Sequence, residues 1–105
     1  METTPVIAFA GEFDLSNAAW FGDEMQRALG SGRSLVVDAS EITYLDSTVL
    51  TALIRVYRLC RKREGKLVVA CPRPTVQRVL QVTGLAQLFS VQSDVNSALV
   101  LASAA

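Results

Sequence analysis

The segment Asp46-Ser47-Thr48 places one carboxylate and two hydroxyls in consecutive positions, which makes it the part of this chain best equipped for chemistry. It stands where a short extended piece meets a long amphipathic pattern. Asp and Ser side chains at such a junction accept hydrogen bonds from the first backbone amides of a helix. Leu50 lies three residues after Ser47, so a capping box does not explain the run. The segment is either a plain helix cap or a cap that also presents a hydroxyl to another molecule.

The residue types give little support to enzyme chemistry. The chain has no histidine, which excludes Ser-His-Asp and Cys-His arrangements and leaves no paired Cys/His ligand set for zinc. Four acidic residues could supply a pair of carboxylates for hydrolysis, but a chain of 105 residues offers little room for a substrate cleft. These acids are Glu12, Asp14, Asp38 and Asp46. We therefore expect no catalytic residue, no metal site and no cofactor.

Cysteine usage and hydropathy indicate a cytoplasmic protein. Cys60 and Cys71 lack C-x-x-C spacing, so we expect two reduced, largely buried thiols, with a redox-controlled pair as the alternative. No apolar run reaches the roughly 18 residues of a membrane span. Residues 1–5 contain an acid and lack the basic segment of a signal peptide.

Acidic residues are concentrated in the first half of the chain and basic residues in the second, although the net charge is zero. Residues 1–46 hold eight acids and two bases, a net −6, and residues 47–105 hold two acids and eight bases, a net +6. The basic half is dominated by one cluster with no interleaved aromatic residue, so direct nucleic-acid binding is not expected. The cluster is either the solvated face of one helix or part of a dipolar surface that orients a protein partner. Its members are Arg55, Arg58, Arg61, Lys62 and Arg63.

Short apolar runs alternate with helical periodicity, a pattern typical of an α/β fold. The runs are apolar on both faces, which favours a mixed, mostly parallel sheet of four to five strands covered by about four helices. We expect a single domain over residues 1–105. Strands are predicted over residues 6–10, 35–37, 42–45, 66–71 and 88–91, helices over 16–29, 46–64, 75–82 and 98–101, and a turn over 11–14.

Four segments, taken together, resemble the STAS-domain anti-sigma factor antagonists. The sequence DSTVL at residues 46–50 is similar to that family's D-S-[ST]-G-L signature, and GEFD at 11–14 to its G-E-hydrophobic-D turn. GKLVV at 65–69 is similar to the glycine and strand that follow the family's central helix, and TGL at 83–85 to its late T-G-L. The segments occur in family order over roughly residues 6–101, so the resemblance implies a STAS-like domain.

The resemblance implies a phosphorylation switch. In that family a partner that is both anti-sigma factor and serine kinase phosphorylates the serine after the aspartate, which here is Ser47. The unphosphorylated antagonist captures the anti-sigma factor and frees the sigma factor, phosphorylation ends the capture, and a phosphatase restores it. Asp46 would fix the loop, and Thr48 is a secondary acceptor candidate. The partner-binding residues implied are Glu12, Asp14, Asp46, Thr48 and Val49.

Two departures from the family pattern leave alternatives open. Val49 stands where the family has glycine, which favours a docking subunit of a signalling scaffold or membrane transporter complex that is not phosphorylated. A small enzyme or ligand binder that merely shares the fold is a further alternative. Ten residues precede Gly11, where the family usually has a fuller extra strand, so we expect a sheet edge that is shortened or exposed for pairing with another chain.

Overall fold

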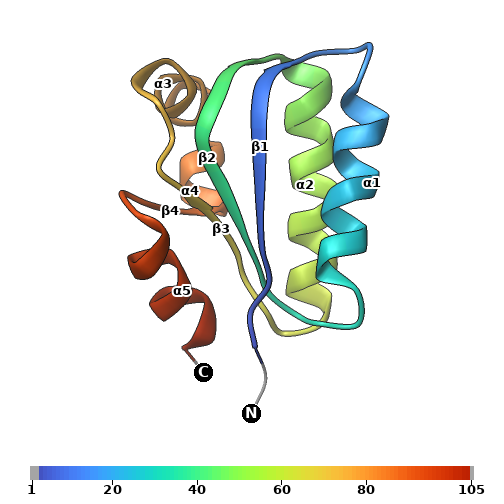
Figure 1. Ribbon diagram of the computed structural model, residues 1–105, viewed down its shortest axis with the longest axis vertical. Helices are drawn as coiled ribbons and strands as arrows, with labels where there is room; N and C mark the ends of the chain where they lie inside the picture. The colour runs from blue at the N-terminus through green and yellow to red at the C-terminus, as the bar shows by residue number, and fades with distance from the viewer. Residues whose placement is uncertain (1–2, 105) are drawn as a thin grey trace.

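The computed structural model describes residues 3–104, which form four strands and five helices. In chain order the elements are β1 (Val6–Phe13), α1 (Ala18–Leu29), β2 (Leu35–Leu45), α2 (Ser47–Lys62), β3 (Leu67–Ala70), α3 (Pro74–Val82), α4 (Leu85–Leu88), β4 (Ser90–Gln92) and α5 (Val95–Ser103). The strands form one sheet in the order β1-β2-β3-β4, and each neighbouring pair is parallel. Helices α1 and α2 cover one face, and α5 lies against the other (Figure 1).

Two apolar clusters hold the layers together. The larger lies between the sheet and α1 and α2, and its aromatic centre stacks Phe9 on Phe21 with ring centroids 4.2 Å apart. The smaller lies under α5 and consists of Val36, Val68, Ala70, Ala98 and Ala102. All four residues of β3 are buried, as expected for a parallel strand covered on both faces.

The predicted α/β fold with a mostly parallel sheet is confirmed, whereas several predicted boundaries were wrong. Residues 11–13 of the predicted turn belong to β1, and the chain turns only after Phe13. The strands predicted at 35–37 and 42–45 are one strand, β2, because the polar residues between them sit at a bulge rather than a break. Leu88 ends the short helix α4, which was not predicted, and β4 begins after it.

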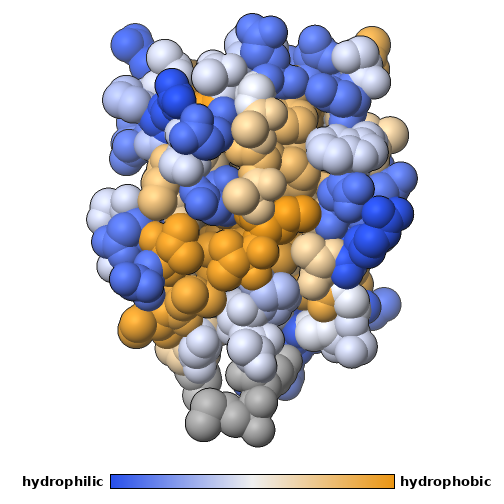
Figure 2. All heavy atoms as spheres, viewed as in Figure 1, coloured by the Kyte–Doolittle hydropathy of each residue, from blue (hydrophilic) through white to orange (hydrophobic). Residues whose placement is uncertain are grey.

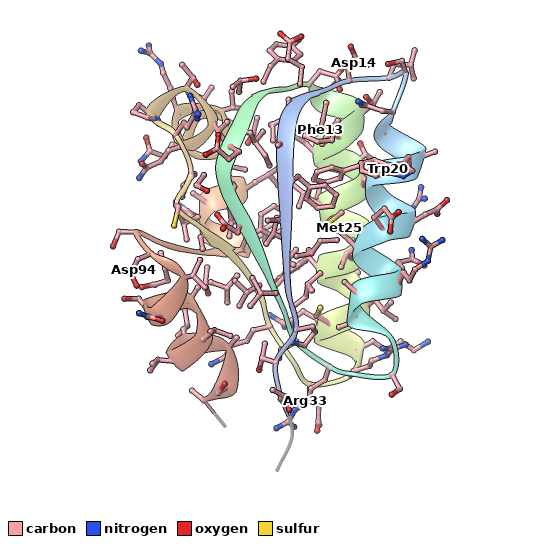
Figure 3. All side chains as sticks on the ribbon, viewed as in Figure 1. Phe13, Asp14, Trp20, Met25, Arg33 and Asp94 are labelled. Carbon is pink, nitrogen blue, oxygen red and sulfur yellow. The ribbon has the colours of Figure 1, made fainter. Side chains whose placement is uncertain are left out.

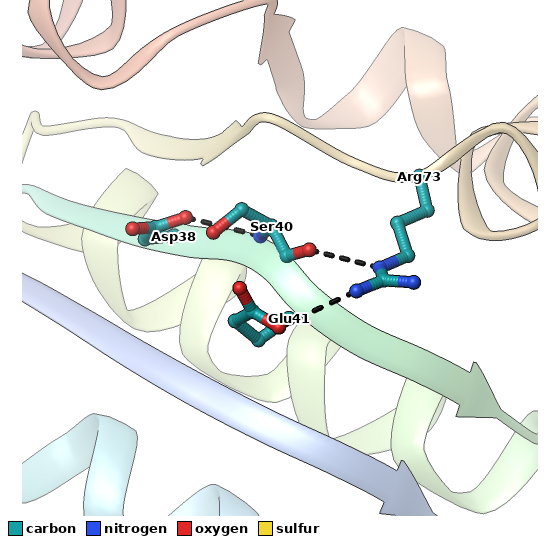
Figure 4. A network of polar contacts seen from close by, with 4 residues as sticks. All are labelled: Asp38, Ser40, Glu41 and Arg73. Carbon is teal, nitrogen blue, oxygen red and sulfur yellow. Dashed lines mark hydrogen bonds and ion pairs between the residues drawn. The ribbon is translucent and has the colours of Figure 1, made fainter.

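The bulge in β2 is held in place by Arg73, from the loop after β3 (Figure 4). The Nε of Arg73 donates to the carbonyl of Ser40 at 2.9 Å, and its Nη2 lies 3.3 Å from a carboxylate oxygen of Glu41. Within the bulge, the amide of Ser40 donates to the carboxylate of Asp38 at 3.0 Å. The side chain of Arg73 therefore ties the loop after β3 to β2 and fixes the course of β2 toward its carboxyl end.

The two cysteines are free thiols in different surroundings. Cys60 lies in the larger cluster and is fully buried, and burial raises the pKa of its thiol to about 11. Cys71 is only partly buried; burial and then the charges of Asp38 and Asp94 raise the pKa of its thiol. Burial is therefore confirmed fully for Cys60 and in part for Cys71, and both thiols are held protonated at neutral pH.

Gly65 packs without space for a side chain, which gives a stability prediction. A Cβ at this position would lie 1.8 Å from the carbonyl oxygen of Arg33, so Gly65→Ala forces the backbone to shift. We expect a loss of about 1–3 kcal/mol in the free energy of unfolding. The matched control is Gly22→Ala within α1, where the nearest atom would be the Ala52 Cβ at 3.5 Å.

The control is expected to gain about 0.5–1 kcal/mol, because alanine replaces glycine inside a helix. Urea unfolding of both variants and the parent chain measures the difference. Equal stability of the two variants would contradict the packing described for Gly65.

Candidate functional site

The candidate site forms where β1 and β2 end, because parallel strands place their carboxyl ends at one edge of a sheet. The amide of Asp46 donates to the carbonyl of Phe13 at 3.3 Å, which joins the two strand ends directly. Asp14 begins the loop to α1, and Asp46 directly precedes α2. Asp14 lies at the end of the molecule farthest from the chain termini (Figure 3).

Asp46 is the N-cap of α2. Its backbone is extended, and its Oδ1 accepts from the amides of Thr48 at 3.0 Å and Val49 at 3.3 Å. The hydroxyl of Thr48 donates to the same oxygen. This hydroxyl and the backbone amides, including that of Leu15, outweigh burial and hold the pKa of Asp46 below its usual value of 3.8. Asp46 is therefore ionised at neutral pH and fixes the start of the helix.

Ser47 is the first residue of α2, and its side chain is exposed. Within residues 3–104 no hydrogen bond involves its hydroxyl, while its carbonyl accepts from the hydroxyl of Thr51 at 3.0 Å. The hydroxyl of Thr48 is already donated to Asp46. Of the two hydroxyls in the segment, the one on Ser47 is therefore the one that another molecule can reach without breaking the cap.

The loop between β1 and α1 is fixed by its own side chains. The carboxylate of Asp14 accepts from both the amide and the hydroxyl of Ser16. The side chain of Asn17 accepts from the amide of Asp14 at 2.8 Å and donates to the carbonyl of Glu12 at 3.0 Å. These bonds give the loop beside the cap of α2 a defined shape.

The structure separates the predicted partner residues into two groups. Asp14, Asp46 and Thr48 are partly exposed and Glu12 is exposed, so all four can contact another molecule. The side chain of Val49 is fully buried in the larger core cluster, so it supports the site from within and offers no contact surface.

Two exposed apolar side chains at this end were missed by sequence reasoning. Leu15 is 77% exposed, and its backbone amide faces the carboxylate of Asp46. Tyr44 is 50% exposed, pairs with Glu12 across the β1–β2 ladder, and borders a shallow hollow of about 70 Å³ between β2 and α3. An apolar residue inside a polar turn, as at Leu15, was the available signal. The site thus combines acidic, hydroxyl and apolar groups, a composition suited to a protein partner.

The described residues hold no group of three or more His, Cys, Asp or Glu side chains able to bind a metal ion. No helix within residues 3–104 is long and apolar enough to cross a membrane.

Comparison with known families agrees with this geometry. The model of the family described as "Mlab, STAS domain" matches residues 2–100, nearly the whole chain. The chain belongs to the STAS-domain family. A STAS-domain-containing protein of Pseudomonas aeruginosa is 29% identical over 85 residues, which are 81% of this chain and 84% of that protein. An anti-sigma-B factor antagonist of Listeria monocytogenes is 26% identical over 88 residues, or 83% of this chain and 77% of the relative.

Solved structures of two kinds share the STAS fold of this chain. An anti-sigma factor antagonist from Mycobacterium paratuberculosis superposes with a TM-score of 0.85 at 24% identity, covering 97% of this chain and 87% of that one. The STAS domain of a SulP transporter from Vibrio cholerae gives a TM-score of 0.73 at 21% identity, with coverage of 97% and 82%. At these identities the likeness shows the fold alone.

The Asp46 cap gives a pH-dependent prediction. Because the pKa of Asp46 is lower in the folded chain, its ionised form stabilises the fold above the usual carboxyl pKa of 3.8, and this contribution disappears as the pH falls through the lower folded value. We expect Asp46→Ala to lower the melting temperature at neutral pH and Asp46→Asn to lower it less, since asparagine also caps helices.

Thermal unfolding between neutral pH and strongly acidic pH measures these differences. The gap between the parent chain and Asp46→Asn should close under acid conditions. A gap that stays constant at all pH values would contradict the ionised cap.

Proposed function

We propose that this STAS domain is an anti-sigma factor antagonist whose capture of an anti-sigma factor ends when Ser47 is phosphorylated. The partner would be both anti-sigma factor and serine kinase, and a phosphatase acting on the phosphoserine would restore binding. The observation that carries the proposal is the exposed Ser47 hydroxyl, which lies beside the Asp46 cap and makes no hydrogen bond within residues 3–104. Relatives named as anti-sigma-B factor antagonists support the same role. The chain would act in the cytoplasm as a binding protein in transcription regulation, and not as an enzyme.

Access to the Ser47 hydroxyl favours phosphorylation even though valine replaces the family's glycine. The Val49 side chain points into the core and has no exposed surface. A kinase that approaches the first turn of α2 therefore meets Ser47 and not the branched side chain of Val49. Thr48 is the weaker acceptor, because its phosphorylation would remove a hydrogen bond from the cap.

A phosphate on Ser47 would change the charge of the docking surface without refolding the chain. It adds about −1.5 to −2 charges at neutral pH. The amino end of α2 partly favours an anion there, whereas the ionised Asp46 beside it opposes one. Burying an unpaired charge against a partner costs about 2–5 kcal/mol, which lowers affinity by about 30-fold to several thousand-fold.

A second function is a docking subunit of a signalling scaffold or membrane transporter complex that binds without phosphorylation. One observation favours it: the fold is shared with the STAS domain of a SulP transporter and with a sulfate transporter family protein. In this case the same end of the molecule would bind its partner constitutively.

Phosphorylation of Ser47 is tested by incubating the chain with its cognate kinase and ATP and mapping the modified residue by mass spectrometry. We expect Ser47 to carry the phosphate and Ser47→Ala to remain unmodified. Calorimetric titration with the partner should show that Ser47→Asp lowers affinity by at least about 30-fold, while Ser47→Ala binds like the parent chain.

The matched control is Thr51→Asp, which places the same charge one turn further along α2 on an exposed side chain. It should weaken binding much less than Ser47→Asp. Phosphate found only at another residue would refute the switch, and a tight complex indifferent to kinase and ATP would select the docking subunit.

A further inference from the structure

Among residues 3–104, strand β1 has a hydrogen-bonding partner strand on one side only, because it stands at the end of the strand order. The carbonyl of Pro5 accepts a hydrogen bond from the amide of Val36 at 3.0 Å, so the carbonyl of Pro5 points toward β2. Alternate residues of a parallel edge strand bond to its neighbour, so the amides and carbonyls of Val6 and Ala8 point away from β2. Such unpaired backbone groups are a template for another strand.

The usual protections of an edge strand are missing along this one. Residues 6–11 contain no charge and no proline, and the extra residues at the two register shifts lie on β2, not on β1. Val6, Ala8 and Ala10 are exposed on the face of the sheet that α5 partly covers. Nothing in the sequence of β1 before Glu12 therefore discourages pairing with another strand.

An apolar band connects this edge to α5. Figure 2 looks directly at the β1 edge, and the band runs from α5 across the lower part of β1 and continues up the strand. Val6 on β1 is 42% exposed, and Val100 on α5 is 75% exposed. Contiguous exposed apolar surface of this kind marks interaction sites.

The distribution of charge indicates which partner fits the edge. Glu12 lies toward the carboxyl end of β1, with Asp14 and Asp46 beyond it, so the surface at the carboxyl end of β1 is acidic. The opposite end carries Arg33, where the chain enters β2, and the cationic end of α2. A second copy in the antiparallel direction brings the acidic end of each copy beside the basic end of the other.

We propose that the chain forms a homodimer in which β1 pairs antiparallel with β1 of a second copy about a two-fold axis at Ala8. Each Ala8 then faces Ala8 of the other copy, and Val6 faces Ala10. Their outward backbone groups exchange hydrogen bonds, and their side chains share the face that carries α5. The interface is self-complementary, as a two-fold axis requires.

This dimer leaves both Ser47 sites free, because they lie at the two far ends of the joined sheet. Each copy could bind its partner separately, and one dimer would present two docking surfaces. The inference goes beyond the proposed function and does not rest on it, because we expect the dimer whether or not Ser47 is phosphorylated.

The test uses charge pairs at the two-fold axis. Sedimentation equilibrium of the parent chain should show a reversible dimer of twice the 11.3 kDa chain mass. Ala8→Lys places two ammonium groups opposite each other, and Ala8→Glu places two carboxylates there. Each variant alone should dimerise at least about tenfold more weakly, and an equal mixture of the two should recover the dimer as a heterodimer.

The matched control is Gln87→Lys, an exposed position on α4, which contacts β4 at the opposite edge of the sheet. It should dimerise like the parent chain. Recovery in the mixture also shows that the Ala8 variants are folded. A parent chain that stays monomeric, a dimer that survives Ala8→Lys, or a mixture that fails to pair would each overturn the proposal.

Discussion

Oδ1 of Asp46 accepts hydrogen bonds from two backbone amides and from the hydroxyl of Thr48, and the geometry of the site depends on these bonds. They occupy orphan amides at the amino end of α2, turn the Thr48 side chain back onto the cap, and leave Ser47 directed outward. The amide of Asp46 is anchored in turn to the carbonyl of Phe13. Asp46 thus joins the ends of two strands, through its amide, to the start of α2, through its carboxylate.

This arrangement is compatible with the switch proposed for Ser47. The exposed hydroxyl sits on a helix terminus whose position is set by packing, because Val49, two residues further along α2, is fully buried. The neighbouring loop is held by Asp14 and Asn17. A change of charge at Ser47 would therefore alter the charge of the surface that a partner contacts, without a change of fold. Leu15 and Tyr44 add apolar surface at the same end, where a partner could bury it.

Local sequence signals predicted the segments with a simple period, and the errors arose where long-range pairing decides the structure. The amphipathic pattern of α2 and its Asp46 cap were readable because both depend on neighbours in the chain. The polar run in the middle of β2 looked like a loop, since neither its bulge nor its contact with Arg73 is visible in the sequence. Gly11 suggested a turn, yet it adopts a positive φ of 105° inside β1 next to a register shift. The burial of Val49 also depends on how α2 packs on the sheet, which a motif alone does not convey.

We propose that a phosphate on Ser47 acts through its charge and leaves the fold unchanged. Amide NMR spectra of the chain before and after phosphorylation of Ser47 test this most directly. The account predicts shifts confined to the first turn of α2 and the loop after β1, with the sheet and α5 unchanged. Shifts spread through β3 and α5 would mean that the phosphate rearranges the fold, and would contradict the account.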